Sequence, residues 1–330
     1  MSKLANWFSG LGTSDRDWRN SAAHLLLLSR FRCGDDPANY SQSAQWISVL
    51  SEQPETAIQR FVHDRVLEPA DLKALVDHKF KATELKAFLK ERGLKVSGRK
   101  DELVNRLINN DAQRMKVETE GLDLYKCTAL GLELAEQYLG RERTRRTFTE
   151  QKTLAFLRSG NLTAAMQTVL EFERTQVFAR VLGVNSDDGE DSDVLVLKDI
   201  FNKTPPILRS LPPDLLGQLR ALAAMMHLWG TNDVRPWTPQ NFETRTNLDP
   251  DTASRMFVFH AWHLRSLRQY RESGVKTVKL FAVGDSMTCQ NCEKMNDKIY
   301  SLRAVPKLPM EKCSSDLGCR CTTVVEDFDF

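Results

Sequence analysis

Residues 82–108 read ATELKAFLKERGLKVSGRKDELVNRLI, and this stretch gives the most specific indication of the fold. Thr83 suits the N-cap of a helix, and Gly93 supplies the left-handed residue that ends it. Apolar residues recur at helical spacing on both sides of a tight turn at Ser97 and Gly98. The stretch therefore predicts two short helices around a small core that contains Leu85, Phe88, Leu89, Leu94, Val96, Leu103, Leu107 and Ile108.

Positive charge is concentrated around this stretch. Residues 79–116 hold 11 Lys and Arg against 5 Asp and Glu, a net charge of +6, whereas the whole chain has a net charge of only +2. The remaining 292 residues therefore sum to −4. Lys95, Arg99 and Lys100 lie in the loop and at the start of the second helix, where free backbone amides and the helix dipole also favour a phosphate. The near-neutral total thus hides a basic module.

These residues resemble a SAP domain, the helix-extended-helix DNA-binding module, at about residues 80–111. The resemblance rests on the Glu-Leu-Lys start at residues 84–86, on Arg-Gly-Leu at 92–94 and on the Ser-Gly-Arg-Lys turn at 97–100. It implies largely non-sequence-specific binding of double-stranded DNA. It also implies that the DNA-binding residues are Lys95, Ser97, Gly98, Arg99, Lys100 and Arg106. The alternative is that these charges only solvate an exposed helical hairpin.

Five of the seven cysteines fall within 33 positions near the C-terminus. Cys289 and Cys292 have the two-residue spacing of a zinc knuckle, and Cys319 with Cys321 can complete four sulfur ligands. Cys313 is a fifth candidate and can replace one of the closing pair. Because four thiolates leave no open position for water, we expect a structural Zn²⁺ ion. A redox Cys-x-x-Cys pair and unrelated surface thiols are the alternatives, while the clustering argues against a disulfide framework.

The residues around the cysteines resemble the C-terminal part of the Mu-F-like phage head-morphogenesis family. The resemblance covers about residues 240–326 and rests on the Asp-x-x-Thr-Cys-x-x-Cys run at 285–292 and on Cys-Arg-Cys at 319–321. The family's closing histidine is absent, and Cys313 lies six positions before Cys319. The resemblance implies a shared fold and a role in head assembly.

Helical periodicity dominates the chain as far as about residue 272, and the clearest strand candidate is 278–283. The predicted fold class is mainly α. A helical N-terminal half carries the SAP helix-extended-helix module, and a C-terminal helical half ends in a small zinc-stabilised α+β unit. The expected domains are a helical region at 1–79, the SAP module at 80–112, an extended piece with a helix and a basic linker at 113–146, a helical region with an acidic loop (185–193) at 147–240, and the Mu-F-like unit with the cysteine cluster at 241–330.

No apolar run approaches the about 20 residues that span a bilayer, and the N-terminus lacks the pattern of a secretory signal. We therefore expect a cytoplasmic protein with no membrane contact. The C-terminal unit, or the acidic and aromatic tail at residues 326–330, is a candidate site for a protein partner.

The sequence favours a non-enzymatic DNA-binding protein, an adaptor or packaging-related factor of a bacterium, phage or mobile element. No catalytic residue is predicted. One alternative is a DNA-processing enzyme such as a nuclease that uses His260, His263, Asp285 or the zinc unit. The other alternative is a phage head or scaffold assembly protein.

Overall fold

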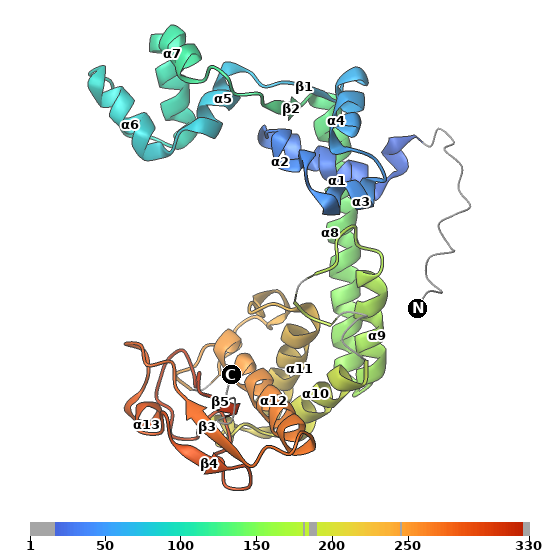
Figure 1. The fold of residues 1–330 in the computed structure, drawn as a ribbon, viewed down its shortest axis with the longest axis vertical. Coiled ribbons are helices and arrows are strands. Elements are labelled where there is room, and N and C mark those ends of the chain that lie inside the picture. The colour runs from blue at the N-terminus through green and yellow to red at the C-terminus, as the bar shows by residue number, and fades with distance from the viewer. Residues whose placement is uncertain (1–16, 181, 185–189, 245, 326–330) are drawn as a thin grey trace. The chain divides into compact units, whose positions relative to one another are not determined.

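The computed structural model describes residues 17–180, 182–184, 190–244 and 246–325, and it divides the chain into two compact units, residues 1–145 and 146–330 (Figure 1). The boundary falls inside one long helix, α8 (Ala129–Arg158), which contains the basic run at 141–146. Because the fold is mainly helical with a small C-terminal sheet beside the cysteines, the predicted fold class is confirmed.

Unit 1 is built from short helices and one two-stranded sheet. Its elements before α8 are η1 (Trp18–Asn20), α1 (Ala22–Arg30), η2 (Phe31–Cys33), α2 (Ala38–Ser41), α3 (Ala44–Leu50), α4 (Pro54–His63), β1 (Leu67–Pro69), α5 (Leu72–Lys79), α6 (Ala82–Glu91), α7 (Lys100–Glu118) and β2 (Tyr125–Cys127). β1 and β2 pair antiparallel, with Leu67 opposite Cys127. The helices α5, α6 and α7 are therefore an insertion between two paired strands. The pairing of β1 with β2 holds the two ends of this insertion side by side.

The inserted helices have a core of their own. It consists of Val76, Phe80, Leu85, Leu89, Leu103, Val104, Leu107 and Met115, all at most 8% exposed. Val76 lies on α5 and Met115 near the end of α7, so the packed module extends beyond residues 80–112 on both sides. At Asp111 the backbone of α7 is not helical, and the Arg92 guanidinium donates to the Asp111 carboxylate from Nε at 3.0 Å and Nη2 at 2.8 Å.

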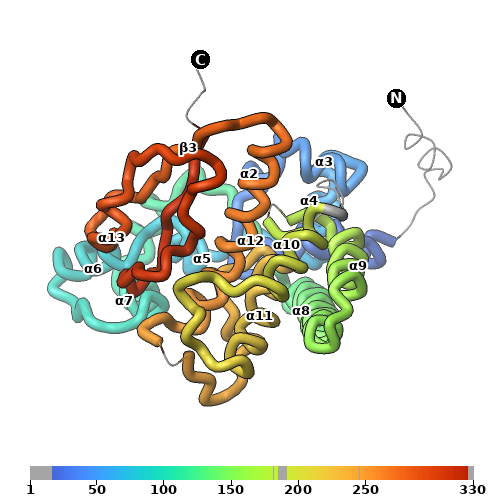
Figure 2. Tube along the Cα trace, turned by 90° about the horizontal axis from the view of Figure 1, so that it is seen from below, coloured from blue at the N-terminus to red at the C-terminus, as the bar shows by residue number. Residues whose placement is uncertain are grey.

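Unit 2 consists of packed helices followed by a small sheet. Its elements after α8 are α9 (Leu162–Glu173), α10 (Glu190–Asn202), η3 (Pro206–Leu208), α11 (Pro213–Trp229), η4 (Arg235–Trp237), α12 (Pro250–Glu272), β3 (Thr277–Phe281), α13 (Gln290–Glu293), β4 (Ile299–Ser301) and β5 (Thr322–Val325). Helices α10, α11 and α12 pack against one another (Figure 2). The antiparallel sheet has the strand order β4-β3-β5.

Local signals in the sequence account for the helices of unit 2. α12 begins at Pro250 because the Asp249 side chain accepts from the Thr252 amide at 2.7 Å, and Gly274 follows its end with a φ of 75°. The strand expected at 278–283 is β3, shifted by one or two residues at its ends. Of the expected acidic loop, residues 185–189 lie outside the described residues. Asp193, in α10, is buried, and its Oδ1 atom lies 3.1 Å from His227 Nε2.

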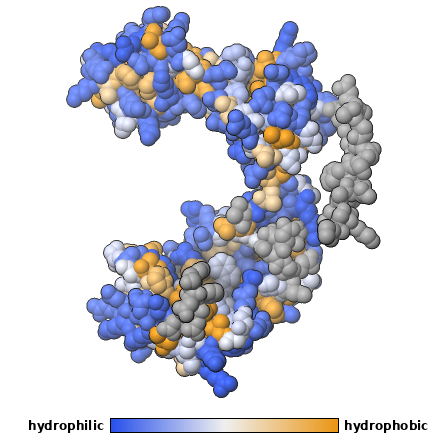
Figure 3. Space-filling model, in the orientation of Figure 1, coloured by the Kyte–Doolittle hydropathy of each residue, from blue (hydrophilic) through white to orange (hydrophobic). Residues whose placement is uncertain are grey.

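Within the described residues, no helix combines the length and the apolar character that a membrane crossing requires. On the face drawn in Figure 3, hydrophobic residues occur in small groups among hydrophilic ones.

We predict that Gly131→Ala lowers the free energy of unfolding by about 1–3 kcal/mol or more, because overpacking forces the backbone to shift. A Cβ atom at Gly131, in the first turn of α8, would lie 1.9 Å from the Val66 carbonyl oxygen, which accepts from the Thr128 amide. Denaturant unfolding followed by circular dichroism measures the effect.

Gly140→Ala, in the same helix, is the matched control, since a Cβ atom at Gly140 would have no neighbour within 4 Å. It should raise stability by up to about 1 kcal/mol. Equal effects of the two substitutions would contradict the close approach at Gly131.

Candidate functional site

The basic turn between α6 and α7 is an exposed loop on a packed scaffold. Lys95, Ser97, Gly98 and Arg99 are all exposed. The Arg99 side chain is 82% exposed, and within the described residues its Nε atom makes two long ion pairs, at 3.7 Å with Asp101 and 3.8 Å with Glu102. The guanidinium is therefore available to an external anion, since long contacts between exposed charges contribute little.

Two other basic residues of this site are engaged with the protein backbone. Lys100 Nζ donates to the Asp77 carbonyl oxygen and lies 3.3 Å from Asp77 Oδ1. Arg106 Nη1 donates to the carbonyl oxygens of Lys95 at 2.6 Å and Ser97 at 3.2 Å. Arg106 thus holds the backbone of the turn, while the side chains of Lys95 and Arg99 are exposed to solvent.

Gly98 and Glu102 define the shape of the turn. Gly98 has a φ of 134°, and a Cβ atom there would lie 2.4 Å from Glu102 Oε2. The same carboxylate oxygen accepts from the Arg99 amide at 3.3 Å, which caps the start of α7. A side chain at position 98 would push this carboxylate away from the cap, and the φ of 134° itself favours glycine.

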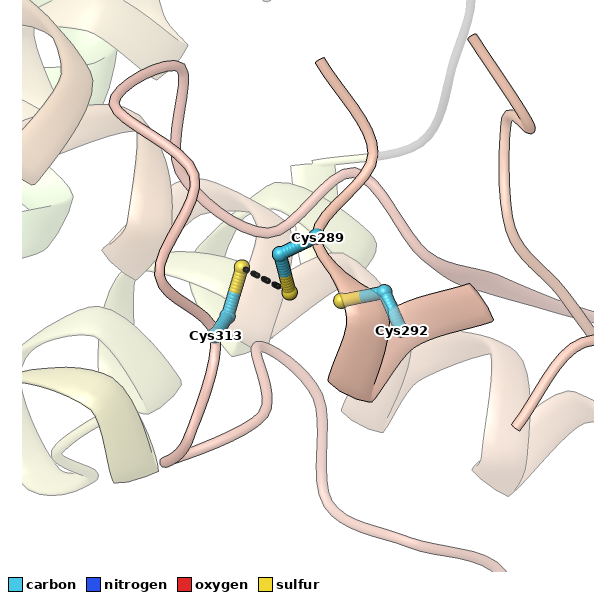
Figure 4. Close-up of side chains that lie close together, drawn as sticks. All are labelled: Cys289, Cys292 and Cys313. Carbon is cyan, nitrogen blue, oxygen red and sulfur yellow. Dashed lines mark hydrogen bonds between the residues drawn. The ribbon is translucent and has the colours of Figure 1, made fainter. Parts of the chain in front are cut away.

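All five clustered cysteines come together beside the C-terminal sheet. The sulfur atoms form two groups, and within each group they lie within 4.8 Å of one another. The first contains Cys289, Cys292 and Cys313 (Figure 4), and the second contains Cys292, Cys319 and Cys321. The Sγ atoms of Cys289 and Cys313 are 3.8 Å apart, and those of Cys292 and Cys319 are 3.9 Å apart. Zn–S bonds of about 2.3 Å in a tetrahedron separate sulfur atoms by about 3.8 Å. These donors therefore fit a tetrahedral thiolate site.

A cavity of about 10 Å³ lies within the cluster, and four of the five cysteines line it: Cys289, Cys292, Cys313 and Cys321. A space of this size holds one water-sized sphere. Cys313, which the sequence offers only as a replacement for another ligand, thus belongs to the cluster, and Cys292 is shared by both groups of sulfur atoms. Cys319 is 1% exposed. Five donors surround a site that needs four.

An ion pair joins the two cysteine-bearing loops. Arg320, between Cys319 and Cys321, donates from Nη1 to Asp285 Oδ2 at 2.7 Å and from Nη2 to Oδ1 at 2.6 Å. Asp285 Oδ1 also accepts from the Thr288 hydroxyl at 3.0 Å. Asp285 therefore orders the loop before Cys289, a role that sequence reasoning did not assign. The Asp-x-x-Thr-Cys spacing in the sequence could have indicated this role of Asp285, because it places an acceptor and a hydroxyl donor three residues apart just before Cys289.

The thiol of Cys289 has a lowered pKa. Although partial burial opposes the charge, hydrogen bonds from the backbone amides of Ser314 and Cys292 lower the pKa of Cys289 to about 7. A large fraction of this thiol is therefore the thiolate, the form that binds metal, at neutral pH.

His260 and His263 on α12 are buried, 4% and 7% exposed. His260 Nδ1 donates to the Leu308 carbonyl oxygen at 2.5 Å, and His263 hydrogen-bonds to the Pro306 backbone. Burial lowers the pKa of both, that of His263 to about 4. They are neutral side chains that hold the loop after β4, and this geometry gives no support to a nuclease role.

Comparison with known families finds the SAP domain model at residues 78–112. It gives no evidence for a Mu-F-like head-morphogenesis region. No curated protein and no solved structure matches the chain. A SAP domain suggests nucleic-acid binding, and it occupies the helices that carry the exposed basic turn.

We predict that the purified protein binds about one Zn²⁺ per chain and that Asp285→Asn weakens zinc binding by about 10–100-fold, as the loss of a group that orients ligands does. Competition with a chromogenic chelator measures the affinity. Glu311→Gln is the control, because Glu311 lies two residues before Cys313 and its side chain is 66% exposed. An unchanged affinity in the Asp285 variant would show that the ion pair does not position the ligands.

We also predict that unit 2 loses stability as the pH falls from about 6.5 to about 4, through His263. The pKa of His263 is lowered to about 4 in the folded chain. Between this pH and about 6.5 the unfolded chain binds a proton at His263 and the folded chain does not, so acid favours unfolding. The loss from this residue is up to about 3 kcal/mol. His263→Gln should abolish that part of the pH dependence in denaturant unfolding, whereas His78→Gln, at an exposed position, should retain the wild-type profile. Identical profiles for wild type and His263→Gln would exclude this role.

Proposed function

We propose that this protein is a non-enzymatic DNA-binding protein whose SAP domain contacts the phosphates of double-stranded DNA, largely without reading sequence. The observation that carries the proposal is the exposed basic turn within residues 78–112. Lys95 and Arg99 project from it, and the N-terminus of α7 adds the positive end of a helix dipole. Ser97, Gly98 and Lys100 complete the contact surface, and Arg106 supports it.

The turn is preorganised, which favours binding. Arg106 holds two of its carbonyl groups, Gly98 and Glu102 fix its bend, and the helices on both sides share a closed core. Little conformational entropy is therefore lost when DNA binds. With four or five phosphates neutralised, log affinity should fall against log salt with a slope of about −4.

The metal is proposed to be structural Zn²⁺, held by four of the five cysteines Cys289, Cys292, Cys313, Cys319 and Cys321. In isolated modules such a site contributes about 10–16 kcal/mol to folding. Here it would fix two loops that contain little regular secondary structure. The Asp285–Arg320 pair supports this arrangement from outside the sulfur cluster.

We further propose an adaptor or packaging-related role in a bacterium, phage or mobile element. The DNA-binding turn and the cysteine cluster belong to separate compact units of one chain. A chain of this kind can bind DNA through one unit and present the other to a second partner. The acidic and aromatic tail at 326–330, a second candidate for that contact, lies outside the described residues.

We predict that Lys95→Ala/Arg99→Ala makes the salt dependence of duplex binding less steep by about 2 in the slope of log affinity against log salt, since each lost phosphate contact removes about 0.9. Fluorescence anisotropy with a labelled 20-base-pair duplex at several salt concentrations measures the slope.

Lys198→Ala/Lys203→Ala is the control for net charge, because both lysines are exposed and lie in or next to α10 of unit 2. Its slope should equal that of the wild type. If the two double variants give the same slope, the SAP turn does not contact the DNA backbone.

A further inference from the structure

The five clustered cysteines offer more sulfur donors than one tetrahedral ion uses. A structural zinc ion takes four thiolates and leaves the fifth sulfur without a role. The sulfur atoms of Cys289, Cys292 and Cys313 form one group of three (Figure 4), and those of Cys292, Cys319 and Cys321 form the other. Cys292 is therefore common to two sets of three donors. Two three-coordinate ions that share one thiolate need five sulfur ligands, and five are present.

The spacing of the sulfur atoms fits three-coordinate ions as well as a tetrahedral one. In the first group the Sγ atoms of Cys289 and Cys313 are 3.8 Å apart, and in the second those of Cys292 and Cys319 are 3.9 Å apart. Three sulfur atoms in a trigonal plane, each about 2.3 Å from the metal, are about 4.0 Å from one another. Distance therefore allows both geometries, and the number and kind of donors decide between them.

The donors around the cluster are soft. Both groups consist of cysteine alone, without a carboxylate or an imidazole. Met287, two residues before Cys289, is 43% exposed and lines the same small cavity as four of the cysteines. Zinc sites are built from cysteine, histidine and carboxylate ligands, whereas thiolate and thioether sulfur together select Cu(I). An all-sulfur cluster with a thioether beside it thus favours a monovalent soft ion.

Each group can be reached from solvent, while the shared ligand lies inside. Cys289 and Cys313 of the first group and Cys321 of the second are half-buried. Cys292 is 3% exposed. An ion can therefore approach either group through a partly exposed thiol and meet the Cys292 sulfur beneath it.

The chain also stabilises negative charge on these sulfur atoms. The backbone amides of Ser314 and Ser315 donate to the sulfurs of Cys289 and Cys313, respectively. The Arg320 guanidinium attracts the thiolates of Cys313 and Cys292. These groups reduce the repulsion among five thiolates, which two monovalent cations neutralise only in part.

We propose that the cysteine cluster binds two Cu(I) ions in place of zinc, each held by three thiolates, with the Cys292 sulfur shared between them. The inference rests on the proposed thiolate site. In the exchange two Cu(I) ions enter, one Zn²⁺ ion leaves, and the thiol that zinc does not use gives up its proton, so no electron is transferred. Two tetrahedral zinc ions that shared one sulfur would need about seven ligands, more than the cluster offers.

The test titrates the full, zinc-loaded chain with Cu(I) in the absence of oxygen, against the chromogenic Cu(I) chelator bathocuproine disulfonate. The wild type should retain about two Cu(I) ions per chain and release its zinc, because soft thiolates favour Cu(I). X-ray absorption at the copper edge should show about three sulfur neighbours per copper, together with a copper–copper vector. The zinc content of the same sample is measured before the titration.

Two variants separate the shared ligand from a ligand of one group. Cys321→Ser should retain about one Cu(I) ion and still bind about one Zn²⁺ ion, since four cysteines remain for zinc and only one group of three for copper. Cys292→Ser should lose the copper–copper vector. Cys33→Ser is the matched control, because Cys33 is an exposed cysteine of unit 1, and this variant should behave as the wild type.

Three results would overturn the copper inference and leave the zinc site standing. They are a wild-type chain that binds zinc but retains at most about one Cu(I) ion, an equal Cu(I) capacity in Cys321→Ser and wild type, and a copper spectrum without the copper–copper vector. A chain that binds neither metal would contradict the proposed zinc site as well, so the two failures are distinguishable. Duplex binding through the SAP turn is measured separately and depends on neither metal.

Discussion

The approach of five cysteine sulfurs to one another is the contact on which the C-terminal part of unit 2 depends. Between β3 and β5 the chain contains only a four-residue helix and a three-residue strand, so few backbone hydrogen bonds hold it. The sulfur cluster, the Asp285–Arg320 pair and the two buried histidines fasten these loops to the sheet and to α12. A bound metal would replace weak thiol contacts by four strong bonds, which is why small irregular units use one.

The SAP domain depends on a different constraint, the pairing of β1 with β2. Because the two strands lie side by side, the inserted helices are tied to unit 1 at both ends, and α5 and the last turns of α7 complete their core. The shared core holds the basic turn in a fixed position relative to α5, α6 and α7.

Much of this organisation could be predicted without coordinates. Helix ends at Asp249 and Gly274, the basic excess around the SAP turn and the spacing of Cys289 and Cys292 are properties of neighbouring residues, and these arise from hydrogen bonds and periodicities within a few positions. The SAP pattern is likewise local, since its two helices and turn close a core within about 30 residues.

Other features could not be predicted, because they join residues that are far apart in the sequence. Only the tertiary structure brings Cys313 into contact with Cys289, joins Arg106 to the backbone of the basic turn, and sets Lys279 between Ile299 and Val324 in the sheet. The sequence by itself determined which chemistry the chain carries, namely a basic turn and a thiol cluster. The tertiary structure decided which of those groups are free to bind and which hold the fold, because packing alone determines which polar atoms face solvent and which meet a partner.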